Sequence, residues 1–290
     1  MSLYDIVLGP FADYAFMRRA LVGCLALCLG ACPLGVVLVL RRMSLVGDAM
    51  AHAILPGAAV GFLVAGFSLF AMTLGGILTG LAVAFLAGLV SRFTTLREDA
   101  SFAAFYLFSL GLGVLLVSVR GSNIDLLHVL FGTVLGLDDA ALFLMATIAS
   151  LTLAALALIY RPLVVECLDP GFLRAVGGWG GVVHMGFVAL VVLNLVGGFQ
   201  ALGTLMVVGI MMLPATAARF WATSVGGQMA VAVFCGLVSS GIGLLVSYHL
   251  NLPASPAIIL SASALYAVSV LIGRVDSLAS RVVKSPSPAG

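Results

Sequence analysis

Long apolar stretches recur along the whole chain, and several reach the roughly 20 residues that a helix needs to cross the hydrocarbon of a bilayer. Hydrophobic residues make up 63% of the sequence and charged residues only 8%. A transmembrane β-barrel would instead show alternating hydrophobicity in segments of about ten residues. The runs here are continuous and rich in Gly, Ala, Leu and Val, so the sequence predicts an all-α polytopic protein in the lipid bilayer.

The lengths of the runs predict about nine transmembrane helices, between roughly eight and ten. Segment 121–137 is apolar but short and interrupted, which favours a re-entrant or surface-lying segment. Residues 1–16 lack signal-peptide features and are interpreted as an interfacial lead-in, and 276–290 as a cytoplasmic tail after a membrane domain over 17–275. The expected spans are 17–40, 49–66, 68–91, 101–119, 139–160, 179–197, 200–218, 225–247 and 254–273.

Positive charges predict the orientation of these spans. With the amino terminus outside, 10 of the 13 Lys and Arg residues face the cytoplasm and 3 face outward, as the positive-inside rule requires. The carboxyl terminus is then cytoplasmic. The net charge is only +2 and no basic stripe is present, so the sequence offers no surface for nucleic acid.

Two ionisable residues, Asp48 and His52, lie four apart where the second span begins. On a helix this spacing puts both side chains on one face, with their Cβ atoms about 5 to 6 Å apart. An ionisable group at the bilayer centre costs roughly 2.5 to 3.5 kcal/mol, so such a pair needs a partner or a function. A carboxylate and an imidazole can hold one divalent cation, which favours metal transport. The alternative is structural, with the carboxylate favoured by the helix dipole and the imidazole hydrated near an interface.

Cys24, Cys28 and Cys32 also share one helical face, in the first span. Three thiols could bind a soft metal, but small residues that let helices approach closely give the same pattern. The spacing favours packing.

No energy source for transport is encoded in the chain itself. A phosphate-binding loop of the type G-x-x-x-x-G-K-[ST] needs a lysine, and the only one, Lys284, follows Val283. No histidine is followed by glutamate, which excludes the H-E-x-x-H motif. An ATP-driven pump would therefore need an ATPase from another chain. An ion-gradient-driven carrier is the competing class, and a membrane enzyme is the weakest because no nucleophile–base pair is evident.

Six sequence blocks, in order over residues 41–273, resemble the membrane permease subunits of bacterial ATP-binding-cassette importers for zinc and manganese. The most distinctive block surrounds Asp48 and His52 and ends in Pro56 and Gly57. The blocks are 43–57, 97–113, 125–132, 161–177, 213–219 and 247–253.

This resemblance implies a homodimeric permease in the bacterial cytoplasmic membrane, a cassette ATPase subunit on its cytoplasmic side and an extracytoplasmic metal-binding protein. It implies no permanently bound cofactor, with Zn²⁺ or Mn²⁺ as the transported substrate. The cytoplasmic loop expected over 161–176 is the candidate ATPase-coupling segment, with Pro162, Asp169, Pro170 and Gly171.

Further metal ligands are expected from His249 and Asn251, before the last span. Asn251 stands where the family commonly has aspartate, and the loss of a hard carboxylate beside an imidazole favours zinc over manganese. The predicted topology puts these two residues toward the outside and Asp48 toward the cytoplasm. The ion could then contact His249 and Asn251 at the entrance of its path and Asp48 and His52 further in. His128 and His184 are interpreted as structural, and Asn194 as a bond between helices or a pore residue.

Overall fold

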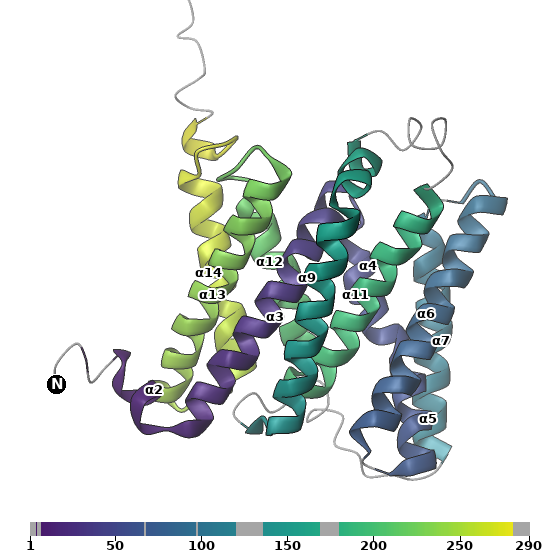
Figure 1. Cartoon of the computed structure of the whole chain (residues 1–290), viewed down its shortest axis with the longest axis horizontal. Helices are drawn as coiled ribbons and strands as arrows, with labels where there is room; N and C mark the ends of the chain where they lie inside the picture. The colour runs from purple at the N-terminus through teal and green to yellow at the C-terminus, as the bar shows by residue number, and fades with distance from the viewer. Residues whose placement is uncertain are drawn as a thin grey trace, which may run out of the picture.

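The computed structural model describes residues 4, 7–66, 68–96, 98–119, 136–168 and 180–280. Regular structure throughout this part is helical, and the long helices stand side by side in one bundle (Figure 1). In chain order the helices are α2 (Gly9–Asp13), α3 (Ala15–Leu40), α4 (Ser44–Ala53), α5 (Leu55–Ala65), α6 (Leu69–Phe93), α7 (Glu98–Val119), α9 (Asp139–Leu168), α11 (Gly180–Leu202), α12 (Thr204–Ala218), α13 (Val225–Leu250) and α14 (Ala254–Ile272).

Eight segments of the described chain are long and apolar enough to cross a membrane, with α4 and α5 counted together. The apolar helix α12 is shorter, at 15 residues. Together these segments coincide with the expected spans, which confirms the all-α polytopic fold. Several boundaries differ. The second span begins at Ser44 and not at 49, and the sixth continues to Leu202 and not only to 197. The largest difference is in the fifth span, which was expected to end at 160 and continues as α9 to Leu168. Arg161 and Pro162 therefore lie in a helix, and the coupling loop expected from 161 starts no earlier than 169.

The chain runs alternately up and down the bundle in Figure 1, beginning at the lower end with α3 and finishing at the upper end with α14. The turn from α11 to α12 needs only Gly203, whose φ of 87° lies in the left-handed region that favours glycine. The upper end is the one predicted to be cytoplasmic, since α3, α12 and α14 all reach it just before an arginine.

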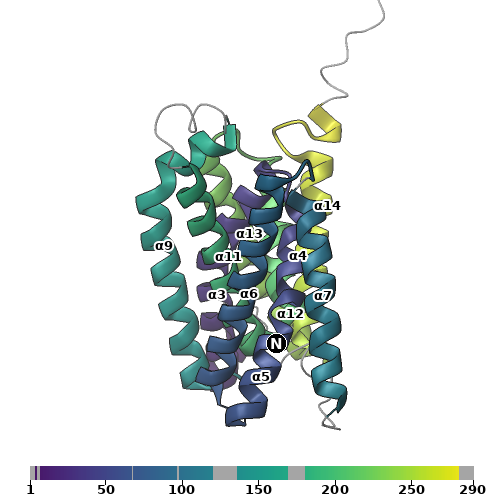
Figure 2. The ribbon, with the colours of Figure 1, turned by 90° about the vertical axis from the view of Figure 1, so that its right-hand side faces the viewer.

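Helix α3 is the centre of the bundle and contacts α4, α9, α11, α12 and α13 (Figure 2). Its cysteines serve this packing: Cys32 Sγ donates to the carbonyl oxygen of Ile210 at 3.3 Å, and Cys28 Sγ lies 3.9 Å from Ser240 Oγ. Among the described residues, no group of three or more His, Cys, Asp or Glu side chains could hold a metal ion. The cysteine stripe is therefore a packing surface.

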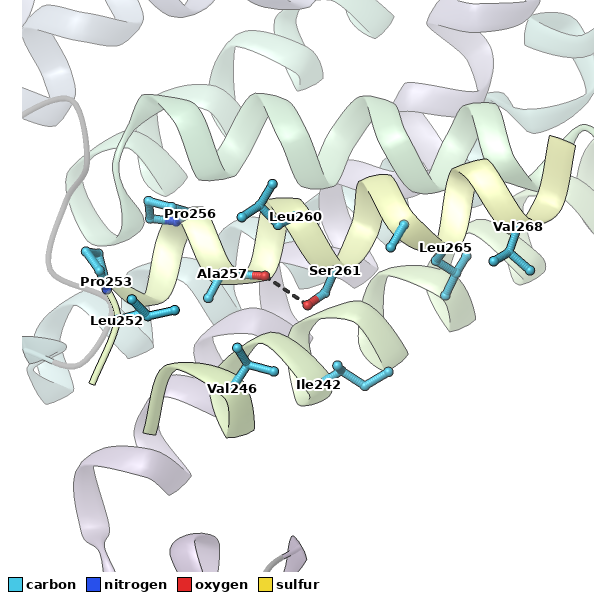
Figure 3. A pocket seen from close by; sticks show the side chains of 11 residues that line it. Ile242, Val246, Leu252, Pro253, Pro256, Ala257, Leu260, Ser261, Leu265 and Val268 are labelled. Carbon is cyan, nitrogen blue, oxygen red and sulfur yellow. Dashed lines mark hydrogen bonds between the residues drawn. The ribbon is translucent and has the colours of Figure 1, made fainter. Parts of the chain in front are cut away.

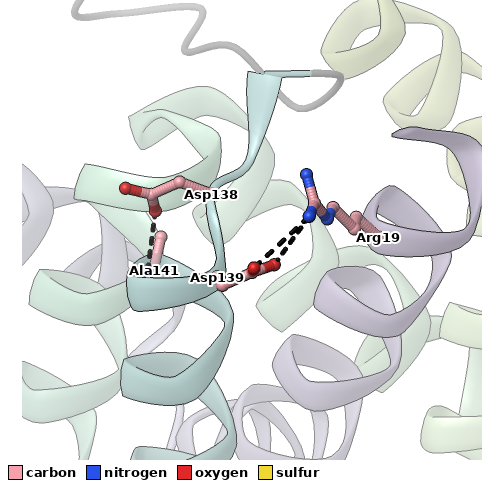
Figure 4. Close-up of polar contacts among 4 residues, drawn as sticks. All are labelled: Arg19, Asp138, Asp139 and Ala141. Atoms are coloured by element: carbon pink, nitrogen blue, oxygen red, sulfur yellow. Dashed lines mark hydrogen bonds and ion pairs between the residues drawn. The ribbon is translucent and has the colours of Figure 1, made fainter. Parts of the chain in front are cut away.

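Two ion pairs connect α3 and its C-terminal cap residue to α9, one at each end of the contact. At the lower end Arg19 Nη2 lies 3.0 Å from Asp139 Oδ1, and Asp138 Oδ1 accepts a hydrogen bond from the backbone N–H of Ala141 in the first turn of α9 (Figure 4). At the upper end Arg41 pairs with Glu166, also at 3.0 Å. The two helices thus run side by side in the same direction.

A groove of about 640 Å³ lies on the outside of the bundle between α13 and α14 (Figure 3). Its lining is almost wholly apolar, and its hydroxyl group, Ser261 Oγ, donates to the carbonyl oxygen of Ala257 in the same helix at 2.8 Å. A surface of this kind has no donor set for a cation, so the metal path has to be sought elsewhere.

Candidate metal site

The second span is a broken helix, and the break lies directly after Asp48 and His52. Helix α4 ends at Ala53 and α5 begins at Leu55, with Pro56 in its first turn. Proline has no N–H to donate to the carbonyl one turn earlier, so the hydrogen-bond ladder is interrupted there. Ser109 of α7 donates to the carbonyl oxygen of Ala53 at 2.8 Å, which satisfies backbone at the break. Interrupted membrane helices are where transporters commonly bind ions.

Asp48 and His52 face one another along the same side of α4. His52 Nε2 lies 3.7 Å from Asp48 Oδ1, close enough for both atoms to contact a single cation. The side chains are 63% exposed for Asp48 and 29% for His52. With Ser44 one turn earlier, they form a polar stripe in which Ser44 and Asp48 are exposed and His52 is half-buried.

The buried residues on the opposite side of α4 determine which way the polar stripe faces. Val46, Ala49 and Met50 are buried against the bundle, which leaves the polar positions on the open side. Helix α7 flanks this side, with the Tyr106 ring 6.5 Å from that of His52. Helix α12 also contacts α4, so α4 itself is packed between neighbouring helices.

His249 and Asn251 lie away from α4, at a different height in the bundle. They belong to the end of α13, at the lower edge of Figure 1, whereas α4 lies in the upper half. His249 is exposed and stacks edge-on against Tyr248, with ring centres 5.2 Å apart. Asn251 caps α13 in the left-handed conformation with φ 51°, which asparagine tolerates well. The structure thus does not bring these two residues together with Asp48 and His52.

The other polar residues singled out in the sequence have different surroundings. Asn194 Nδ2 donates to Thr152 Oγ1 at 2.7 Å and to the Leu190 carbonyl oxygen at 2.9 Å, so Asn194 bonds α11 to α9 across the core. His184 is buried in α11. His128 lies outside the described residues.

Of the candidate coupling residues, only Pro162 is described, as a half-buried residue inside α9. Asp169, Pro170 and Gly171 lie outside the described residues.

Sequence reasoning missed two residues for which the structure shows specific partners. Ser109 was not singled out, because nothing in the sequence places this serine beside the break, 56 residues away. Glu166 was not singled out either, and it falls within the coupling loop expected over 161–176. Its charge so close to an apolar run was a signal that it needs a partner, but its partner Arg41 is 125 residues away in sequence.

A bundle of membrane-spanning helices with an acid–imidazole pair beside a helix break defines a polytopic membrane transport protein. The chain belongs to the ABC 3 transport family, whose model matches residues 13–273. It is a multi-pass permease subunit in the bacterial cytoplasmic membrane, and ATP hydrolysis resides in a separate chain.

Known relatives align over nearly the full length of the chain. The manganese import system permease protein ScaB of Streptococcus parasanguinis is 30% identical over 90% of this chain and 91% of its own. The chelated iron transport system membrane protein YfeD of Yersinia pestis is 27% identical over 96% and 92%. The solved structure of PsaBC from Streptococcus pneumoniae in complex with Fab matches with a TM-score of 0.82, at 27% identity over 93% of this chain and 96% of that one.

Proposed function

We propose that this permease moves a divalent transition metal into the cytoplasm, and that Asp48 and His52 contact the ion on its way. The observation that carries the proposal is the 3.7 Å separation of a carboxylate oxygen and an imidazole nitrogen on one partly exposed face of α4. A carboxylate directed at hydrocarbon would be costly, so a 63% exposed Asp48 requires a hydrated path or a second protein surface.

A second copy of the chain can supply that surface. One chain offers two ligands, whereas structural zinc sites have four and Mn²⁺ prefers more oxygen-rich shells. If the α4 faces of two permeases meet about a two-fold axis, Asp48 and His52 of both copies surround one ion. Four groups completed by water can remove the hydration shell without forming a permanent cage, as a carrier requires.

Manganese is the first candidate for the transported ion, followed by iron and zinc. The expectation of zinc rested on His249 and Asn251, and these residues lie at the lower end of α13, whereas α4 lies in the upper half of the bundle. The replacement of a carboxylate by Asn251 therefore does not alter the donor set on α4. The names of the relatives, which specify manganese or chelated iron, support the same order.

The remaining partners follow the architecture of such importers. We propose that a cassette ATPase docks at the upper end of the bundle and contacts Pro162 and the segment with Asp169, Pro170 and Gly171. An extracytoplasmic metal-binding protein would deliver the ion at the lower end, near His249 and Asn251. ATP binding would then favour one of two permease packings, with different metal affinity in each. In the competing mechanism, an ion gradient replaces the ATPase.

Uptake of Mn²⁺ by liposomes that contain the permease, its ATPase and the loaded binding protein tests the proposal. Asp48→Ala and His52→Ala should abolish uptake, because each removes one ligand type from the site, while the complex still assembles. Ser44→Ala, one turn earlier on the same stripe, is the matched control and should transport normally. Full uptake by both ligand variants would remove the site, and uptake without ATPase would favour the gradient mechanism. Competition by Zn²⁺ and Fe²⁺ in the same assay ranks the metals.

A further inference from the structure

The ion pair between Arg41 and Glu166 is buried, unlike an ordinary surface contact. Arg41 Nη2 lies 3.0 Å from Glu166 Oε1, and the side chains are only 13% and 8% exposed. The guanidinium also lies over the Phe187 ring of α11, 5.8 Å from its centre. Removing two charges from water is expensive, and apolar side chains of similar volume often stabilise a protein as well or better. Stability alone therefore does not account for this pair.

The pair is also incompletely hydrogen-bonded. Within the described residues, Arg41 Nη1 and Glu166 Oε2 are buried without a hydrogen-bond partner. Unsatisfied buried polar atoms lower the stability that a buried pair can contribute. The pair is costly to desolvate and incompletely hydrogen-bonded, yet it joins α3, α9 and α11. We therefore explain it by its effect on the relative positions of these helices.

Arg41 lies between α3 and α4, the helix that holds Asp48 and His52. It is the C-terminal cap residue of α3, and α4 begins at Ser44 after a turn of three residues. The turn is tightly bonded: the backbone N–H of Arg42 donates to the Val39 carbonyl oxygen at 3.2 Å, and that of Met43 to the Leu38 carbonyl oxygen at 2.9 Å. A shift of the Arg41 guanidinium would therefore be transmitted to the start of α4 and to Asp48.

Glu166 lies at the other side of the contact, in the last turn of α9. This helix has 30 residues, which at 1.5 Å per residue corresponds to roughly 45 Å, more than the roughly 30 Å of bilayer hydrocarbon. The helix is therefore long enough for its upper end to extend past the hydrocarbon, on the side where the ATPase is proposed to dock. Glu166 is three residues before Asp169, the first residue of the proposed coupling segment that the structure does not describe.

We propose that the Arg41–Glu166 pair links ATPase-driven movement of α9 to the position of α4. The pair holds the start of α4 at a fixed offset from the end of α9, so that displacement of α9 moves Asp48 and His52 relative to the rest of the bundle. Arg41 and Glu166 are positioning residues and do not contact the ion. This inference rests on the proposed function, because it needs an ATPase at the upper end and a metal on α4.

The test is the number of metal ions imported per ATP hydrolysed, measured with the complete complex in liposomes. Glu166→Gln removes one charge at nearly constant shape, and the double variant Arg41→Leu/Glu166→Leu removes both charges. Each should lower the metal-to-ATP ratio about tenfold, within the range of coupling between distant sites. Hydrolysis should continue. The control is Arg19→Gln/Asp139→Asn, which breaks the exposed pair between the same helices and should keep the ratio within about twofold.

A purely structural pair would lower uptake and hydrolysis together and leave their ratio unchanged, and that result overturns the proposal. Failure of both charge-removing variants to assemble would overturn it too, because the pair would then serve only folding. Mn²⁺ binding separates this inference from the proposed function: Glu166→Gln should still bind the ion, whereas Asp48→Ala should not. Normal import by Asp48→Ala would overturn the metal assignment whatever the Glu166 variants do.

Discussion

The two ends of the α3–α9 contact have the same chemistry in opposite surroundings. At the lower end Arg19 and Asp139 are 46% and 80% exposed, and at the upper end Arg41 and Glu166 are 13% and 8% exposed, although both pairs have a 3.0 Å contact. Water and salt screen the first pair, whereas the second has lost most of its hydration. Equal distances therefore do not imply equal energies, and only the upper pair is expected to restrict how the two helices move.

The largest effect is expected from Arg41→Ala. It leaves Glu166 charged and buried without its partner, which typically costs about 3 to 5 kcal/mol. Thermal unfolding of the purified permease should show a markedly lower midpoint than wild type. A midpoint close to wild type would mean that water reaches Glu166 and that the ion pairs at the two ends of α9 are equally hydrated.

Removing both upper charges should recover most of that loss. Arg41→Leu/Glu166→Leu leaves no buried charge, and apolar replacement of buried pairs is often neutral or stabilising. We expect the free energy of unfolding of the double variant to be at least about 2 kcal/mol higher than that of Arg41→Ala. A double variant as unstable as the single one would show that the loss comes from packing against Phe187 and not from an unpaired charge.

Breaking the lower pair should have a small effect. Exposed pairs contribute about 0.2 to 1 kcal/mol, so Arg19→Gln should shift the unfolding midpoint only slightly. Asp139→Asn is the companion variant, and the double variant should equal either single one, since there is one contact to lose. A loss comparable to that of Arg41→Ala would contradict the assignment of the lower pair to solvent.

The smallest expected effect is that of salt on the stability differences between wild type and the two arginine variants. It should distinguish the exposed ion pair from the buried one. Raising the ionic strength from about 0.1 M to 1 M shortens the Debye length from about 10 Å to 3 Å. The stability difference between wild type and Arg19→Gln should then vanish, while that between wild type and Arg41→Ala should persist. Unfolding midpoints at the two salt concentrations provide the measurement. Equal sensitivity of both differences would mean that the pairs are equally hydrated.

Much of the fold was predictable because the membrane imposes a length and a composition on each span. The shared face of Asp48 and His52 followed from helical spacing, and their distance from His249 and Asn251 followed from the predicted topology. The end of the fifth span was misplaced because Arg161 and Pro162 usually end an apolar run. Here the helix continues for six more residues beyond Pro162, to Leu168.

Contacts between distant segments were not predictable from one sequence. The bond from Ser109 to the helix break and the partnership of Glu166 with Arg41 depend on how helices pack, and hydropathy does not encode that arrangement. Asn251 differs from these contacts, because its left-handed conformation at the end of α13 is a local feature that asparagine commonly has there.

The central claim is that the α4 face binds the transported ion, and equilibrium binding of Mn²⁺ to the purified complex tests it most directly. Electron paramagnetic resonance of free Mn²⁺ would report the bound amount. We expect about one ion per permease dimer, because the proposed site takes Asp48 and His52 from each of two copies. Binding should be lost in Asp48→Ala/His52→Ala and kept in His249→Ala. Undiminished binding by the double variant would contradict the account.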